Sequence, residues 1–412
     1  MERIAFINIV CNGSTGRIMR ELQEKANENN FETIAFYGRG AGYTHLNCVK
    51  VGNKLSILLH AILSYFLGLH GFGSYFSTKK LIRELNSYKP NVIHLHNIHG
   101  YYLNYRVLFN WLENEYKGKV IWTLHDCWSF TGHCAYFTYV GCNSWKTACH
   151  DCPEKRKYPC NFGIDNSKFI YNHKKHYFTL LENKRLVLTT PSKWLKDLVD
   201  LSFMNKYDVK IINNWVDYNQ FKPVKDTSIM KKYNIPEDKK ILLGVANVWD
   251  DRKGLKLFEE IAEVISNRYV VVLVGLTNSQ CKKVPKNIVG VERTENVEEL
   301  VALYSNARIF LNPSYEETFS LVTIEAMACG VPVIVLNTSA VKELVTRDTG
   351  LVLTKLKVDL WTDAIQKVDN GDYSSDRIRK HVIDNYNKEV KIKEFINLFI
   401  NESEINTKRG EI

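Results

Sequence analysis

The chain has 412 residues, which is long for a single hydrophobic core and predicts two domains. Its residues are 45% hydrophobic and 24% charged, with only nine prolines, which excludes a largely disordered protein. The net charge of +10 suits anionic phosphates or an anionic membrane surface, and no nucleic-acid-binding motif accompanies it, so we expect no nucleic-acid partner.

The chain opens with a pattern typical of nucleotide-binding α/β domains. Ile4–Val10 reads as a buried strand, Gly13–Gly16 as a glycine-rich turn, and Arg17 begins a helical pattern. The turn is neither a dinucleotide fingerprint nor a P-loop, so by itself it is also compatible with a plain β–α connection. The apolar run after Arg3 is too short for a secretory signal, and we predict a cytoplasmic protein.

Lys54–Leu85 contains an apolar run from Leu55 to Leu69, which is too short for a membrane span. The sequence predicts a buried helix here. The alternative is an interfacial helix flanked by Lys79, Lys80 and Arg83, which would suit an acceptor anchored in a bilayer.

Histidines follow two predicted strands. His96, Asn97 and His99 come after Val92–Leu95, and His125 comes after Lys119–Leu124. Functional side chains collect at the carboxyl ends of strands in open parallel sheets, so these histidines are candidate site residues.

Cysteines are concentrated between Cys127 and Cys160. The spacing Cys149-x2-Cys152 is the tight half of a structural zinc site, but Cys134 and Cys142 are more widely spaced than a standard knuckle. We predict a structural zinc held by Cys134, Cys142, Cys149 and Cys152. Reduced, uncoordinated cysteines and a disulfide are the alternatives, and the disulfide is disfavoured in the cytosol.

The second half of the chain repeats the strand–loop–helix pattern. Ile241–Ala246 reads as a strand, and Arg252, Lys253 and Gly254 precede a helix. Basic side chains before a helix N-terminus suit a diphosphate, and an exposed basic turn is the alternative.

The stretch LNPSYEETFSLVTIEAMACGVPVIVLN, from Leu311 to Asn337, contains two glutamates in a Glu-x7-Glu pattern. The pattern resembles the signature of retaining nucleotide-sugar glycosyltransferases of the GT-B type, family 4. The matched residues are Glu317, Phe319, Leu321, Glu325, Ala326, Met327, Ala328, Gly330, Pro332 and Val333. The segments PNVIHLHNIHGYYLN and HDCWSFTGHC, with the cysteines after them, resemble a bacterial exopolysaccharide and colanic-acid subgroup of that family.

The resemblance implies an α/β fold of two Rossmann-like parallel-sheet domains facing a cleft. The expected domains are 1–221, with a Cys-rich insertion at 127–160, then 222–375, and a C-terminal helix, 376–412, that crosses back to the first domain. One departure is Asn247, which stands where the family usually has an arginine after the strand, so Arg252 would have to supply that phosphate contact.

The resemblance also assigns roles to individual residues. The residues expected in catalysis are Glu317, His125 and Lys253. The residues expected to bind the donor or its nucleotide are Glu325, Arg252, Ser320, Leu321, Val322, Gly16 and Thr15. His96 and His99 are expected on the acceptor side, and catalysis is expected to need no cofactor.

The implied function is transfer of a sugar from a nucleotide-diphosphate sugar to a saccharide acceptor, expected to be lipid-linked, in bacterial surface-polysaccharide assembly. Capsule, exopolysaccharide and O-antigen are the expected products, and the inner face of the plasma membrane is the expected location. The alternative is a non-catalytic nucleotide-sugar- or carbohydrate-binding protein of the same fold. A dinucleotide-dependent oxidoreductase is disfavoured because no G-x-G-x-x-G motif follows a strand.

Overall fold

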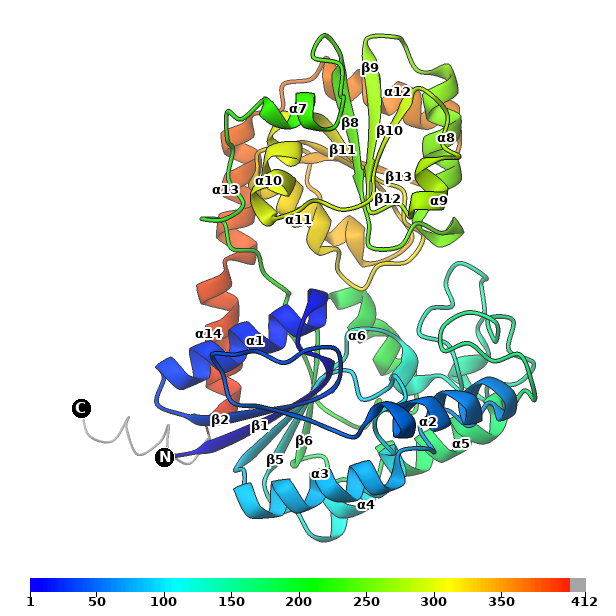
Figure 1. The fold of residues 1–412 in the computed structure, drawn as a ribbon, viewed down its shortest axis with the longest axis vertical. Helices are drawn as coiled ribbons and strands as arrows, with labels where there is room; N and C mark the ends of the chain where they lie inside the picture. The colour runs from blue at the N-terminus through cyan, green and yellow to red at the C-terminus, as the bar shows by residue number, and fades with distance from the viewer. Residues whose placement is uncertain (401–412) are drawn as a thin grey trace. The chain divides into compact units, whose positions relative to one another are not determined.

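The computed structural model describes residues 1–400, which form two compact units (Figure 1). The first unit contains residues 1–213 and the segment from Ile392 onward, and the second is Asn214–Lys391. Each unit is built on its own parallel β-sheet with helices on both faces, which confirms the prediction of two Rossmann-like domains.

The first sheet has seven strands in the order β3-β2-β1-β4-β5-β6-β7. Its strands are β1 (Arg3–Val10), β2 (Glu32–Arg39), β3 (Cys48–Lys50), β4 (Val92–Leu95), β5 (Lys119–Thr123), β6 (Leu186–Thr190) and β7 (Val209–Ile211). The helices of this unit are α1 (Gly13–Glu28), α2 (Lys54–Leu67), α3 (Tyr75–Tyr88), α4 (Tyr105–Asn114), α5 (Ser167–Phe178) and α6 (Lys193–Asp200).

Successive side chains along each strand of the first sheet point to opposite faces, so each strand contributes side chains to the packing on both faces. Ala5 and Ile7 of β1 share a core with Leu85 of α3 and Leu108 of α4. Phe6 points the other way, and its ring lies 5.9 Å from that of Phe399, near the end of the described chain. Both faces carry apolar side chains because helices pack on both sides of the central strands of this parallel sheet.

The second sheet has six strands in the order β10-β9-β8-β11-β12-β13. Its strands are β8 (Lys240–Val245), β9 (Tyr269–Val274), β10 (Ile288–Val291), β11 (Ala307–Asn312), β12 (Val333–Leu336) and β13 (Gly350–Leu353). The helices that come after β7 in the chain are α7 (Ser228–Lys232), α8 (Leu255–Val264), α9 (Asn278–Cys281), α10 (Val297–Asn306), α11 (Leu321–Ala328), α12 (Val358–Asp369), α13 (Ser375–Tyr386) and α14 (Lys388–Phe399). Helices α8 and α12 cover one face of this sheet, and α10, α11 and α13 cover the other.

The chain divides at slightly different residues from those expected. Asn214 to Phe221 belong to the second unit, because Val216 pairs with Asn387 and the Arg379 guanidinium donates to the carbonyls of Tyr218 and Phe221. The single long C-terminal helix of the prediction is two helices, since Asn387 is extended, with φ −63° and ψ 125°. Only the part from Ile392 onward belongs to the first unit, and residues 401–412 of the predicted segment lie outside the described residues.

The prediction of a buried helix in the apolar run from Leu55 to Leu69 is wrong. Helix α2 forms there, but only His60 and Ser64 are buried, while most of its apolar side chains are exposed. Within residues 1–400, none of the helices has the length and apolar character needed to cross a membrane.

Candidate active site

The candidate donor site lies where the strand order of the second sheet reverses. Strands β8 and β11 are neighbours, but the chain leaves β8 toward β9 and leaves β11 toward β12, in opposite directions along the sheet. Ligands of open parallel sheets bind outside the carboxyl ends of the strands at such a reversal. The loops after β8 and β11 carry the predicted Lys253 and Glu317.

The structure brings Lys253 and Glu317 together as an ion pair between these two loops. The side chains of Lys253 and Glu317 are 20% and 14% exposed, so both remain reachable from solvent. The backbone N–H of Lys253 donates to the Asp250 carboxylate at 3.0 Å, and that of Glu317 donates to Ser339 Oγ at 2.9 Å. Hydrogen bonds from the backbone N–H groups of Lys253 and Glu317 therefore hold both partners of the ion pair in place.

Gly254 allows the close approach of these loops. Its φ is +75°, and a Cβ there would lie 2.8 Å from Pro313 Cγ in the loop after β11. A larger residue would both strain the backbone and push the two loops apart.

Arg252 contacts the same loop through both its side chain and its backbone. Its guanidinium donates to the Glu316 carbonyl at 2.8 Å, and its own carbonyl accepts from the N–H of Tyr315 at 2.8 Å. The side chain predicted to replace the missing arginine contact thus lies beside the Lys253–Glu317 pair.

The N-terminus of α11 supplies backbone donors. Ser320 has φ +88°, and its hydroxyl accepts from the Asn312 amide at 2.9 Å. Leu321 and Val322 occupy the first turn, whose N–H groups have no acceptor within the helix. Such a terminus favours an anion.

Glu325 lies one turn further into α11 and is 5% exposed. Tyr304 donates its hydroxyl hydrogen to Glu325 Oε2 at 3.3 Å. The carboxylate is thus oriented within its own domain.

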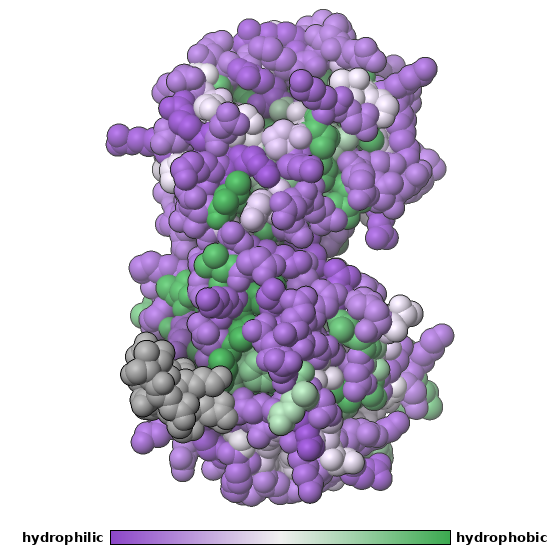
Figure 2. Space-filling view, turned by 90° about the vertical axis from the view of Figure 1, so that its left-hand side faces the viewer, coloured by the Kyte–Doolittle hydropathy of each residue, from purple (hydrophilic) through white to green (hydrophobic). Residues whose placement is uncertain are grey.

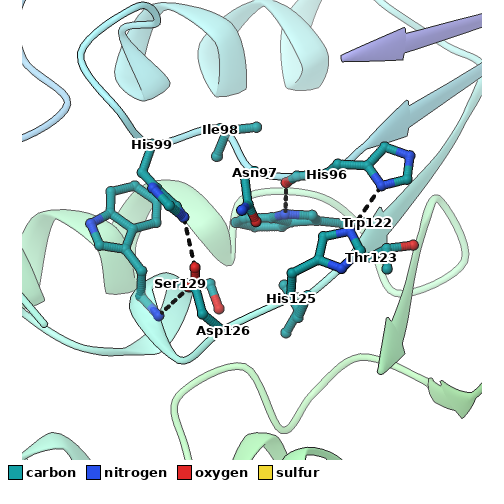
Figure 3. A pocket seen from close by; sticks show the side chains of 11 residues that line it. His96, Asn97, Ile98, His99, Trp122, Thr123, His125, Asp126 and Ser129 are labelled. Atoms are coloured by element: carbon teal, nitrogen blue, oxygen red, sulfur yellow. Dashed lines mark hydrogen bonds and ion pairs between the residues drawn. The ribbon is translucent and has the colours of Figure 1, made fainter. Parts of the chain in front are cut away.

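In the first unit, the predicted histidines do meet at the carboxyl ends of β4 and β5 (Figure 3). His96 Nδ1 lies 3.0 Å from His125 Nε2, and the two rings are stacked with an interplanar angle of 10°. One ring must donate the hydrogen bond and the other must accept it, so at least one of these two ring nitrogens is unprotonated. Burial lowers the pKa of His125 to about 4, and burial together with His94 and His125 lowers the pKa of His96 well below its usual value.

His99 takes part in a different network. Its Nε2 lies 2.8 Å from Asp126 Oδ2 and its Nδ1 lies 2.8 Å from the Tyr158 hydroxyl. Burial raises the pKa of Asp126, but His99, the N–H of Trp128 and His125 together outweigh burial, and the pKa of the carboxyl falls below its usual value. Because both ring nitrogens are engaged, His99 is held in place by its neighbours. Asp126 and Tyr158 were not predicted as partners of His99, although a carboxylate next to His125 at a strand end was a readable signal.

The glycine-rich turn after β1 is built for close packing. A Cβ on Gly16 would lie 2.3 Å from the Cys11 carbonyl carbon, so α1 can begin this close to β1 only with glycine. Thr15 Oγ1 accepts from the Asn8 side-chain amide at 3.4 Å, and Asn8 Oδ1 also accepts from the N–H of Asn97 at 3.2 Å. The turn is therefore tied to the segment that carries His96. Its predicted contact with the donor stays a prediction.

The four cysteines predicted as zinc ligands lie between β5 and α5. The thiols of Cys134 and Cys152 share a hydrogen bond, and Cys149 Sγ accepts one from the N–H of Gly132 at 3.1 Å. All ten cysteines lie in the described part of the chain, and none of them forms a disulfide. Across residues 1–400, no three His, Cys, Asp or Glu side chains are grouped so as to hold a metal ion. The structural zinc stays a prediction, which metal analysis of the purified protein tests.

Solved structures share this two-domain architecture over almost the whole chain. Sucrose-phosphate synthase from Thermosynechococcus elongatus is 18% identical, with a TM-score of 0.71, covering 97% of this chain and 98% of that one. HepE from Anabaena, solved with UDP-glucose, is 12% identical, with a TM-score of 0.64, covering 97% of this chain and 99% of that one. The fold is therefore that of the GT-B glycosyltransferases.

Sequence comparison adds the chemical class. The putative colanic acid biosynthesis glycosyl transferase WcaC of Escherichia coli strain K12 is 23% identical over 375 residues, which cover 87% of this chain and 88% of that protein. Together with the fold, this similarity defines the protein as a glycosyltransferase. Residues 239–369, in the second unit, match the family model of the glycosyl transferases group 1, so that unit carries a glycosyl transferase group 1 domain. The matched range contains Lys253, Glu317 and Glu325.

Proposed function

We propose that the protein transfers a sugar, with retention of anomeric configuration, from a nucleotide-diphosphate sugar to a lipid-linked saccharide in bacterial surface-polysaccharide assembly. The observation that carries the proposal is the Lys253–Glu317 pair at the strand reversal, with the N-terminus of α11 and Glu325 on the same segment. The name of the WcaC relative supports polysaccharide assembly, and HepE, solved with UDP-glucose, supports a nucleotide-sugar donor. Since such donors are cytoplasmic compounds, we place the reaction at the inner face of the plasma membrane.

In the proposed reaction, the bond between the sugar C1 and the diphosphate oxygen breaks, and a bond forms between C1 and an acceptor hydroxyl oxygen. With attack on the same face, the acceptor proton passes to the departing phosphate oxygen, so the step needs no cofactor. Negative charge develops on the diphosphate as it leaves. Lys253, Arg252 and the first N–H groups of α11 would stabilise that charge, and one such contact contributes about 3 kcal/mol to lowering the barrier.

The two glutamates have different tasks in this proposal. Glu325 is buried and oriented by Tyr304, and a carboxylate can accept hydrogen bonds from both ribose hydroxyls at once. Glu317 is paired with Lys253, so donor binding would let Lys253 turn toward phosphate while Glu317 accepts from a sugar hydroxyl.

The histidines of the first unit act as neutral groups in this proposal. With a pKa of about 4, His125 is uncharged near pH 7 and can exchange hydrogen bonds with a sugar hydroxyl without carrying a charge. His96 acts as a positioning residue, because its ring is stacked on that of His125 and shares a hydrogen bond with it.

Nucleotide release from UDP-, GDP- and dTDP-sugars tests the proposal. We expect release from one donor, with a lipid-linked acceptor present, and a loss of about 100-fold in Glu325→Gln, since the amide accepts fewer hydrogen bonds than the carboxylate. Glu263→Gln, on the exposed side of α8, is the matched control and should behave as wild type. Donor binding without release, in a folded protein supplied with acceptor, would instead establish a non-catalytic binding protein.

A further inference from the structure

Helix α2 turns its polar side inward and its apolar side toward solvent, the reverse of an ordinary surface helix. A surface helix normally turns its apolar stripe toward the core and its polar stripe toward water. In α2 the buried residues are His60 and Ser64. The apolar residues that point outward, with their exposed fractions, are Leu55 (63%), Leu58 (56%), Leu59 (57%), Ile62 (44%) and Phe66 (57%). Their spacing places them on one side of the helix, opposite His60 and Ser64.

Hydrogen bonds fix this orientation. The N–H of Gly71 donates to His60 Nε2 at 3.0 Å, so the other ring nitrogen carries the hydrogen and donates to Ser74 Oγ at 3.0 Å. Ser74 Oγ in turn donates to the Tyr101 carbonyl at 3.0 Å. Turning the helix to bury its leucines would break this chain of bonds and leave the buried Gly71 N–H and Ser74 hydroxyl without His60 as a partner.

A second segment, almost a hundred residues later, extends the apolar side. The N–H groups of Phe162 and Ile164 donate to the carbonyls of Tyr65 and Phe66 at 2.9 and 3.0 Å. The ring of Phe162 stacks on Tyr65 with a centroid distance of 5.0 Å. Phe162 and Ile164 are 54% and 58% exposed, so they continue the surface formed by α2. We call the exposed apolar residues of α2, together with Phe162 and Ile164, the α2 patch.

The helices beside the α2 patch carry mostly basic charged side chains. Ser56 of α2 contacts Ser77 of α3 at 3.0 Å between their hydroxyl oxygens, so the start of α3 borders the patch. Helices α2, α3 and α5 contain one acidic residue, Glu84, whereas their basic residues are Lys54, Lys79, Lys80, Arg83, Lys168, Lys174 and Lys175. Lys174 is buried, and the other six are exposed. In contrast to the apolar α2 patch, most of the molecular face drawn in Figure 2 is covered by hydrophilic residues.

We infer that the α2 patch docks onto an anionic lipid bilayer, with α2 lying in the plane of the interface. The apolar side chains would enter the boundary between headgroups and acyl chains, and the basic side chains of α2, α3 and α5 would contact anionic headgroups. A helix of 14 residues is about 21 Å long, shorter than the hydrocarbon core of about 30 Å, so it suits an in-plane position. A second copy of the chain is a poorer occupant, because the basic side chains of its own α2, α3 and α5 would meet those of the first copy.

Docking of the α2 patch would bring the enzyme to its acceptor, because a lipid-linked acceptor is presented at a bilayer surface. In this respect the inference rests on the proposed function. It does not need sugar transfer in order to be tested. Vesicle binding can be measured without donor or acceptor, so the two proposals can fail separately.

The test is flotation of the full chain with vesicles of phosphatidylcholine alone and vesicles containing about 30% phosphatidylglycerol. We expect binding to the anionic vesicles that weakens with added salt, and a loss of about tenfold or more in the triple variant Leu59→Gln, Ile62→Gln, Phe66→Gln. The three positions are exposed, so the variant should fold. The matched control is Leu201→Gln, Val264→Gln, Val390→Gln, which replaces three residues exposed by 58%, 62% and 53% elsewhere on the chain.

Three results would overturn the inference: no flotation of the wild type with anionic vesicles, equal flotation of the triple variant, or equal loss in the control. A dimer in solution that the triple variant dissociates would assign the patch to a second copy instead. Loss of nucleotide release with vesicle binding intact would count against the proposed function and leave the docking surface standing.

Discussion

Substitution of Lys253 should affect the activity of the protein far more than its stability. Its ammonium pairs with Glu317, and both side chains keep some contact with water. Partly exposed ion pairs stabilise proteins by about 0–1 kcal/mol, so Lys253→Met should lower the free energy of unfolding by no more than about 1 kcal/mol. If Lys253 also stabilises the leaving diphosphate, the substitution should raise the barrier to transfer by about 3 kcal/mol, which is a loss of roughly 150-fold in kcat/KM.

The assay compares urea unfolding with nucleotide-release kinetics for wild type, Lys253→Met and Lys256→Met. Lys256 is one turn further along, 83% exposed and paired with Glu260 at 3.6 Å, which makes it a matched control for loss of one ion pair. We expect Lys256→Met to leave both quantities nearly unchanged. A loss of less than tenfold in kcat/KM for Lys253→Met, or an equal loss for Lys256→Met, would refute the assignment of Lys253 to the leaving group.

Two further predictions concern stability. Burial lowers the pKa of His60, His125 and His133 to about 4 and that of His94 to about 3, below the value near 6.5 of the unfolded chain. The unfolded state therefore binds more protons as the pH falls below about 6.5, and each such histidine removes up to about 3 kcal/mol of stability by pH 4. Melting temperatures should be level near pH 7–8 and fall steeply below about pH 6; a level profile down to pH 5 would contradict this. Gly330→Ala should cost about 2 kcal/mol in denaturant unfolding, because φ is +79° and the new Cβ would lie 1.8 Å from Ser375 Oγ. Gly141→Ala, with φ +65° and no heavy atom within 4 Å, should cost only the backbone strain of about 1 kcal/mol, and equal costs would exclude the contact with Ser375.

The sequence determined the local features of this protein. Apolar strands followed by helices recur through both halves, and that alternation already implies parallel sheets covered on both faces. The motif from Glu317 to Val333 also predicted correctly that Glu317 lies in a loop and that Glu325 lies in the helix after it. These positions depend only on spacing within one segment.

Strand order decided which distant side chains meet. Lys253 and Glu317 are separated by 64 residues, and they pair because β8 and β11 are neighbours in the sheet. His96 and His125 meet for the same reason at β4 and β5. Spacing along a chain carries no information about which strands become neighbours, so the candidates could be selected from the sequence while their partners could not.

Tertiary structure also decided the direction of α2. Its hydrophobic content alone favoured burial, because apolar composition does not say which face a helix turns inward. The contacts of His60 with Gly71 and Ser74, residues in the segment that leads from α2 to α3, set that direction. Similarly, the break at Asn387 follows from its pairing with Val216, a contact between segments 171 residues apart that no local pattern could reveal. Local periodicity thus determined which elements form, and contacts between remote segments determined how their faces and side chains are used.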